Sequence, residues 1–504
     1  MAESEDHMRR GSAREPSLAD ALIPVVALIG LLGASYHLFG DLASQGPNQI
    51  ALLFCGLIAA GIAYKNGMGW GALRQATVDG VSSGLVAIFI LLAVGALIGT
   101  WAMSGTIIAM VYYGLGVLSP NYFYASSAII CAVVALSIGS SWTVAGTIGI
   151  GLMGIAANMG LSPAITAGAV ISGAYFGDKA SPLSDTVNLA TASAGSELFE
   201  HIRETLWTSV PSLLLAVLLF ALLGAPSDFD PAETLATIER HHDVTPWAFV
   251  PLAFVFALAV LRLPAFVTIF GGALLGGVMA VILNPDLVIG FAADPTLPAP
   301  LAALKGVWKA LASGYVAATG APEIDSLLSR GGMESMLGTV WLIMTALAFG
   351  AVVEHAGLLA RLVNPILHRA RSVGGLVASV VASCIGANIV TSDQYIAIVL
   401  PGRMFRAEFA RRGLAPVVLS RAVGDSATVT SPLVPWNSCG AYMAATLGVP
   451  VLSFAGFAFF CIVNPLITIL IAVIGFRMIK TPGATPPGLG TLVDGDRGQV
   501  ATQI

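Results

Sequence analysis

The stretch ISGAYFGDKASPLSDTVNLA, residues 171–190, places two aspartates, a lysine and several hydroxyl groups directly after an apolar run. That run, residues 162–176, carries no charged side chain. A charged group at membrane depth costs about 3 kcal/mol, so such groups usually face a cavity or a partner. Pro182 has no N–H and therefore frees the carbonyl of Asp178 from its helical hydrogen bond. This pattern indicates a membrane protein in which a broken helix lines a cavity.

The rest of the chain supports a membrane location. Of its 504 residues, 56% are hydrophobic and only 10% are charged, and the mean hydropathy is +0.86. A soluble domain carries roughly 25% charged residues. Apolar runs such as residues 84–103, 336–353 and 451–476 reach or exceed the length of about 18 residues that marks a transmembrane helix. We therefore predict an all-α polytopic membrane protein with about 12 transmembrane helices, within a range of about 10 to 14.

The positions of Lys and Arg predict the orientation of the chain. They gather in the first 20 residues, at Lys65 and Arg74, at 361–371, at 403–412, and at Arg477 and Lys480. Since positive residues mark cytoplasmic segments, both termini are expected in the cytoplasm. Residues 1–20 are interpreted as a cytoplasmic polar tail, and the Pro/Gly-rich residues 481–504 as a disordered cytoplasmic tail. The net charge of −5 argues against a nucleic-acid partner and leaves the lipid bilayer as the expected surroundings.

The apolar segments divide into two halves that echo one another. The first transmembrane half spans residues 21–225, and the second spans 335–480, with a connecting region of further helices and loops at 226–334. In the first half a polar break at 139–143 precedes the GDKASPLSD motif; in the second, a break with SDQY precedes Gly424-Asp425 and the sequence SPL. Corresponding interruptions in two halves are typical of a transporter built from repeats, with its site near the membrane midplane.

The polar motifs offer oxygen ligands that suit a small alkali cation. Freed carbonyls at Asp178 and Thr428, nearby hydroxyls, an amide and a carboxylate occur in both halves. A carboxylate partly removed from water takes up a proton more readily, so Na⁺ and H⁺ would compete for it. Asp178 is the first choice for this carboxylate, followed by Asp425 and Asp393, with Asp178 and Asp425 as candidate Na⁺ ligands. Lys179 would pair with a carboxylate and release it; the alternative is a fixed Asp178–Lys179 ion pair that holds the broken helix.

Four motifs resemble the signatures of the NhaC-type Na⁺/H⁺ antiporters of the ion transporter superfamily. They are GAYFGDKASPLSDTVNLA (173–190), SLLSRGGMESMLGTVWLI (326–343), TSDQYIAIVLPGRMF (391–405) and GDSATVTSPLVPWNSCGAYM (424–443). They occur in order, and the likeness covers most of residues 20–480.

The resemblance implies a bacterial inner-membrane antiporter with two inverted structural repeats and broken or re-entrant helices at the midplane. It would exchange cytoplasmic Na⁺, or Li⁺, for external H⁺ by alternating access, with no enzymatic activity, no catalytic residue and no cofactor. A homodimer is left open. With Lys179, the implied site residues are Asp178, Ser181, Asp185, Thr186 and Asn188 in the first half, and Asn388, Asp393, Asp425, Ser431 and Asn437 in the second.

Three other functions remain open at this point. Relatives of the resembled family exchange malate for lactate or carry amino acids with Na⁺, so an organic-solute carrier on the same fold is the main alternative. A carboxylate substrate would favour an arginine at midplane depth, and the sequence offers only Arg421 near the second motif. An intramembrane aspartyl protease is remote, because Tyr175 and Ala422 stand where its GxGD pattern has the first glycine. A passive channel would not need titratable groups in both halves.

Overall fold

The computed structural model describes residues 14–224, 231–241, 244–318, 325 and 328–481. Within these residues the regular secondary structure is helical, with two isolated β-bridges, Tyr315–Arg330 and Leu414–Lys480. The all-α prediction is therefore confirmed. Residues 1–13 and 482–504 of the two predicted tails lie outside the described residues.

Eight of the described helices are long and apolar enough to cross a membrane. They are α2 (Leu18–Phe39), α3 (Pro47–Lys65), α5 (Leu85–Met103), α7 (Phe123–Ile138, preceded by a 3₁₀ turn from Pro120), α12 (Leu198–Leu222), α15 (Ala265–Leu283), α19 (Leu337–His355, preceded by a turn from Met333) and α21 (Val373–Thr391). Three shorter apolar segments, Thr106–Val117, Pro246–Val260 and Phe459–Ile474, accompany them. A polytopic membrane protein is thus supported, while the count of about twelve spans stays a prediction.

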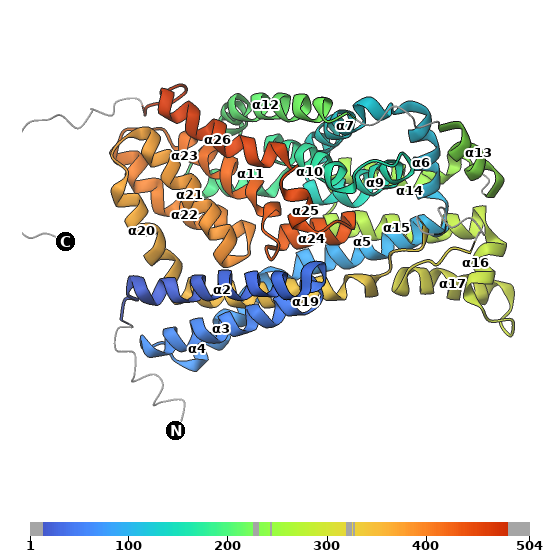
Figure 1. Ribbon diagram of the computed structural model, residues 1–504, viewed down its shortest axis with the longest axis horizontal. Helices are drawn as coiled ribbons and strands as arrows, with labels where there is room; N and C mark the ends of the chain where they lie inside the picture. The colour runs from blue at the N-terminus through green and yellow to red at the C-terminus, as the bar shows by residue number, and fades with distance from the viewer. Residues whose placement is uncertain (1–13, 225–230, 242–243, 319–324, 326–327, 482–504) are drawn as a thin grey trace, which may run out of the picture.

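The helices form two layers that run along the long axis of the molecule (Figure 1). In one layer α19 packs on α3 and α4 (Trp70–Ser83), and α15 packs on α5. In the other, α10 (Pro163–Ala180) packs on α7, and α12 and α21 both contact α26 (Phe459–Ile474). Each layer takes helices from both halves of the sequence. The two halves therefore interleave in space rather than form separate bodies.

Close backbone packing fixes α10 against α7. A Cβ atom added at Gly173 would lie 2.1 Å from the Ala128 carbonyl oxygen, and one added at Gly177 would lie 2.3 Å from the Leu136 nitrogen. Only glycine leaves room for this approach. Because Asp178 follows Gly177 directly, this glycine seam (Gly173 and Gly177 against α7) positions the first-choice carboxylate beside the C-terminal end of α7.

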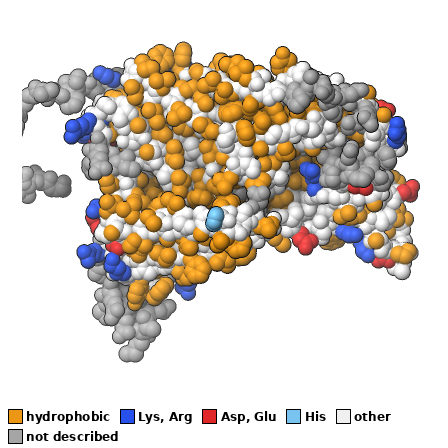
Figure 2. All heavy atoms as spheres, viewed as in Figure 1, with side chains coloured by type: hydrophobic (Ala, Val, Ile, Leu, Met, Phe, Trp, Pro, Cys, Tyr) orange, Lys and Arg blue, Asp and Glu red, His pale blue; other side chains and the backbone are white. Residues whose placement is uncertain are grey.

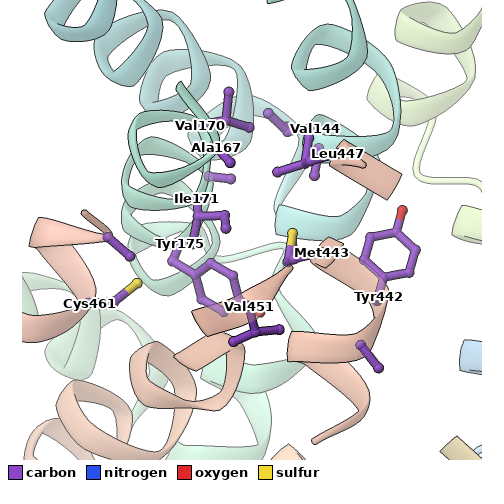
Figure 3. Close-up of a cluster of buried hydrophobic side chains, with 14 of the residues drawn as sticks. Val144, Ala167, Val170, Ile171, Tyr175, Tyr442, Met443, Leu447, Val451 and Cys461 are labelled. Carbon is purple, nitrogen blue, oxygen red and sulfur yellow. The ribbon is translucent and has the colours of Figure 1, made fainter. Parts of the chain in front are cut away.

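A buried apolar cluster joins α10 to the last helices of the chain. Figure 3 shows Ile171 and Tyr175 of α10 beside Met443 and Leu447 of α24 (Ser438–Leu447) and Cys461 of α26. All of these side chains are at most 4% exposed. The cluster holds the first-half motif and the second-half motif in one layer.

Helix breaks occur at corresponding places in the two halves. After α7, Gly139 takes a left-handed conformation and Ser140 caps α8 (Ser141–Val144). After α21, Ser392 takes the same conformation (φ 60°) and Asp393 caps α22 (Gln394–Arg411). A second break separates α10 from α11 (Asp185–Ala194), and another precedes α24. The order helix, break, helix thus occurs twice in each half, which agrees with the predicted repeats; their inverted relation stays a prediction.

Several predicted cytoplasmic segments come together at one end of the molecule. Lys65 pairs with Asp20 at 2.7 Å, Arg412 donates to the Ser372 carbonyl at 3.0 Å, and Lys480 bridges to Leu414. Figure 2 shows hydrophobic side chains over the middle of this face, with charged side chains mostly toward the two ends. This distribution suits helices that cross a bilayer along the long axis.

Candidate functional site

A cavity of about 460 Å³ lies where the two layers meet. One wall comes from the α4–α5 region, the loop between α14 (Val250–Val260) and α15, and Leu347 of α19. The other wall comes from the α7–α8 break and the ends of α10, α11, α22 and α24. Its charged lining residues are Asp178, Asp185, Asp393 and Arg262, and its hydroxyl lining residues include Ser140, Ser141, Thr143, Thr186 and Ser438. Four predicted site residues, Asp178, Asp185, Thr186 and Asp393, therefore share this cavity.

Asp178 is held by hydroxyl groups from two different helix breaks. Asp178 lies in the last turn of α10, and its side chain is 4% exposed. Ser141 donates to one carboxylate oxygen at 2.6 Å, and Ser184 donates to the other at 2.6 Å. The Ser184 and Thr186 hydroxyls share a further hydrogen bond of 2.9 Å. The result is a carboxylate surrounded by hydroxyl oxygens at the wall of the cavity.

The other two carboxylates lie at helix N-termini. Asp393 caps α22 by accepting the Ile396 N–H at 2.8 Å, and it is 5% exposed. Asp185 begins α11, is exposed, and accepts the Tyr395 hydroxyl at 2.6 Å. The partial positive charge of a helix N-terminus stabilises an anion there. Together with Asp178 they give the cavity an acidic wall built from α10, α11 and α22.

Lys179 and Asp425 form a separate, sealed group. The Lys179 ammonium contacts the Asp425 carboxylate and also donates to Ser209 at 2.8 Å and to Asn464 at 3.0 Å. Neither residue of the pair lines the cavity, and both are at most 1% exposed. The hypothesis of a fixed Asp178–Lys179 pair is therefore wrong: the lysine pairs across the molecule, and Asp178 is left to the hydroxyl groups.

Three second-half residues of the predicted site brace the backbone around the α24 break. Asn388 donates to the Ala427 carbonyl at 2.8 Å. Asn437 donates to the Asn388 carbonyl at 3.2 Å and caps α24 through the Cys439 N–H. Ser431 donates to the Thr428 carbonyl at 2.8 Å. The prediction that the Thr428 carbonyl is free to bind a cation therefore needs correction, because a hydroxyl group already satisfies it.

The remaining two residues of the predicted site also lie off the cavity. Ser181 is fully buried and accepts the Leu183 N–H at 3.3 Å. Asn188 is exposed and donates to the Ser184 carbonyl at 2.8 Å. Both stabilise the turn between α10 and α11, which in turn holds Ser184 against Asp178.

Sequence reasoning missed a buried polar stripe on α12. Six of its residues are at most 1% exposed: His201, Glu204, Thr205, Thr208, Ser209 and Ser212. Thr208 and Ser209 contact the Asp425–Lys179 pair, and Glu204 pairs with Arg477 and lies 3.7 Å from Arg421. The signal was available, since these residues recur at intervals of three and four along the helix.

Two aromatic rings join the halves beside the cavity. Trp142, a lining residue, stacks on Tyr442 with centroids 3.9 Å apart and an interplanar angle of 11°. The Tyr442 hydroxyl donates to the Trp142 carbonyl at 2.8 Å. The break that carries Ser141 is thereby anchored to α24.

The donor set favours a loosely held hard cation over a fixed metal centre. Within the described residues, no three His, Cys, Asp or Glu side chains are grouped to hold a metal ion. The cavity instead offers separated carboxylates with hydroxyl groups between them. Oxygen donors of this kind bind hard cations.

Comparison with known proteins identifies the family. Residues 173–476 match the family described as "Na+/H+ antiporter family", and this match contains all three acidic residues of the cavity. The chain is 37% identical over 438 residues to the Na⁺/H⁺ antiporter NhaC of Alkalihalophilus pseudofirmus, covering 86% of this chain and 91% of that protein. The chain belongs to the Na⁺/H⁺ antiporter family.

Two further relatives show that proteins similar to this chain do not all carry the same name. NhaC of Bacillus subtilis is 35% identical over 429 residues, covering 84% of this chain and 91% of that protein. A malate-2H⁺/Na⁺-lactate antiporter of Bacillus subtilis is 32% identical over 450 residues, covering 88% and 92%. The resemblance to NhaC-type antiporters is therefore confirmed, and family membership by itself does not fix what a member carries.

Proposed function

We propose that this protein is a secondary transporter that exchanges cytoplasmic Na⁺ for external H⁺ across a bacterial inner membrane by alternating access. The observation that carries the proposal is Asp178, a buried carboxylate held by Ser141 and Ser184 on the wall of a cavity between two helix layers. The two NhaC relatives are also more similar to this chain than the malate–lactate antiporter is.

The geometry supplies what exchange requires. A Na⁺ ion that leaves water needs several oxygen ligands, and Asp178, Ser141, Ser184 and Thr186 offer them close together. The serine hydroxyls that donate to the carboxylate have lone pairs that can turn toward an ion. A proton on Asp178 would remove the negative charge that attracts Na⁺. Binding of the two ions is then mutually exclusive, and alternating access converts this competition into exchange.

We extend the proposal to the membrane topology. The helix–break–helix order in both halves supports two inverted repeats, with the breaks at the midplane. Basic residues at one end support cytoplasmic termini. Two termini on one side imply an even number of spans, and we propose about 12. The division at residues 21–225, 226–334 and 335–480 belongs to the same proposal, as does the expectation of no cofactor. A homodimer stays open.

An organic-solute carrier is the second candidate, and one observation favours it. The cavity of about 460 Å³ exceeds what one small ion needs, and Arg262 on its wall could meet a substrate carboxylate. A protease gains no support, because Asp425 is sealed by Lys179 and does not face Asp178 across the cavity.

The test is dissipation of a ΔpH in proteoliposomes on addition of NaCl, LiCl, KCl, or malate with lactate. Asp178→Asn is compared with wild type and with Asp286→Asn, a control at an exposed acid of α16 (Pro285–Ala292). We expect a Na⁺-dependent response that Asp178→Asn loses and Asp286→Asn keeps. A response to the organic acids without any response to cations would instead make the protein a solute carrier.

A further inference from the structure

Arg262 is the one basic residue among the described residues that line the cavity. It lies in the short loop between α14 and α15, on the wall that faces Asp178, Asp185 and Asp393. Its side chain is exposed. The guanidinium group is thus a permanent positive charge at a cavity whose other charged side chains are all acidic.

The backbone at this position favours glycine over arginine. Arg262 has a φ of 62°. Its N–H donates to the Ala259 carbonyl at 2.9 Å, and the Leu263 N–H donates to the Leu258 carbonyl at 3.2 Å. This is the Schellman pattern that ends a helix, in which glycine is the usual residue in the left-handed position. A non-glycine residue kept in such a conformation beside a binding cavity points to a role for its side chain.

The charges of the cavity raise a question of ion selectivity. The negative charge of three carboxylates would attract Ca²⁺ or Mg²⁺ more strongly than Na⁺, since the Coulomb attraction grows with the charge of the cation. The repulsion between a fixed positive charge and a bound cation is proportional to the charge of that cation. Arg262 therefore opposes a divalent ion by twice the energy with which it opposes a monovalent one.

We infer that Arg262 is a specificity-determining residue that makes the cavity select monovalent over divalent cations. The inference rests on the proposed function, in that it takes the cavity as the cation pathway. Arg262 needs no direct contact with the ion, because its charge acts across the cavity. It lowers the affinity for Na⁺ moderately and the affinity for Ca²⁺ severely, which keeps the acidic wall from being blocked by divalent cations.

Three substitutions at this position distinguish the effect of the positive charge from the effect of the left-handed backbone conformation. Arg262→Gln removes the charge and keeps a non-glycine residue in the left-handed conformation. Arg262→Gly removes the charge and relaxes the backbone, so it folds at least as well as wild type. Arg262→Lys keeps both the charge and the backbone conformation.

The measurement is Na⁺-dependent ΔpH dissipation in proteoliposomes, with the half-saturating Na⁺ and the half-inhibitory Ca²⁺ concentrations determined for each variant. In Arg262→Gln and Arg262→Gly we expect the half-saturating Na⁺ concentration to fall by a factor on the order of 3, and the half-inhibitory Ca²⁺ concentration by roughly the square of that factor. Arg262→Lys should keep both values. Added choline chloride should shrink the differences, because salt screens charges at an exposed site.

The outcomes that would overturn the inference are specific. The inference would be contradicted if Arg262→Gln and Arg262→Gly kept the half-inhibitory Ca²⁺ concentration of wild type. It would also be contradicted if the Na⁺ and Ca²⁺ concentrations fell by the same factor, since a nonspecific structural defect does not distinguish monovalent from divalent ions. A Lys variant that behaves like the Gln variant would also contradict it. The failure of the proposed function looks different: wild type itself would show no Na⁺-dependent response, and the inference would fall with it.

Discussion

Lys179 pairs with Asp425, 246 positions away in the sequence, and not with Asp178, its immediate neighbour. The two motifs that the sequence suggested as equivalent therefore have different tasks in the structure. One carboxylate faces the cavity, and the other is bound to a lysine inside the layer. The Lys179–Asp425 pair fixes the end of α10 to the π-helical segment Gly424–Thr428.

The Lys179–Asp425 pair should matter for folding more than for ion binding. Removing one partner of a buried ion pair leaves an uncompensated charge and destabilises a protein by about 3–5 kcal/mol. We expect Lys179→Met and Asp425→Asn each to lower the unfolding temperature in detergent, and the double variant to recover much of the loss. The five buried free cysteines make a thiol-reactive dye a convenient readout. Single variants as stable as wild type would contradict this assignment.

The two serines at Asp178 should set the affinity for Na⁺. In the proposed Na⁺-bound state each serine oxygen turns toward the ion. A polar contact to a charged group contributes about 1.5–3 kcal/mol, so Ser141→Ala and Ser184→Ala should each raise the half-saturating Na⁺ concentration roughly tenfold or more. Ser137→Ala is the matched control, since its exposed hydroxyl donates only to the Val133 carbonyl of its own helix. If all three variants showed the same Na⁺ dependence, the hydroxyl groups would not belong to the ion site.

The glycine seam should tolerate no side chain. In Gly177→Ala the new Cβ would lie 2.3 Å from the Leu136 nitrogen, and overpacking of this kind costs about 1–3 kcal/mol. We expect a lower unfolding temperature and weaker transport, because Asp178 is displaced with α10. Gly386→Ala on α21, where an added Cβ meets nothing within 4 Å, should leave both unchanged or raise stability slightly. Equal behaviour of the two variants would rule out the seam as the cause.

Glu204 should be required for the stability of the folded protein, because its carboxylate lies beside the buried Arg421. Arg421 is 1% exposed, and its Nη1 lies 3.7 Å from the Glu204 carboxylate. Glu204→Gln leaves that guanidinium group buried without this counter-charge. We therefore expect the free energy of unfolding to fall by about 3–5 kcal/mol. The comparison is Glu200→Gln, one turn earlier on α12 and partly exposed. A thermal unfolding curve for Glu204→Gln that overlays that of Glu200→Gln would argue against the pairing.

The sequence predicted those features that depend on local composition. The apolar runs were enough for an all-α membrane protein, and the helix breaks at Gly139 and Pro182 were visible as polar interruptions. Asp178 could be singled out because both the break and the carboxylate lie in one short stretch. Residues 171–190 thus contained most of what was correct about the site.

What the sequence could not predict depends on contacts between distant segments. The partner of Lys179 is set by the packing of α10 against the π-helical segment Gly424–Thr428, which no local pattern records. The role of Arg262 required knowing that the loop before α15 faces α10 across the boundary between the layers. The α12 stripe was visible in principle, because its polar residues recur at helical spacing.

The glycine seam has a mechanical consequence. Because the α7 and α10 backbones are in close contact, the two helices form one rigid unit. This unit carries Asp178 at one end, where Ser141 of α8 donates to its carboxylate. Close-packed interiors transmit strain rather than absorb it. Opening the cavity toward the other side of the membrane must therefore move α7 and α10 together, as a rigid unit, relative to the other layer. The resistance to that motion arises at the layer boundary and in the surrounding lipid. Turnover should then respond to bilayer thickness, even though the proposed ion ligands keep their positions relative to one another.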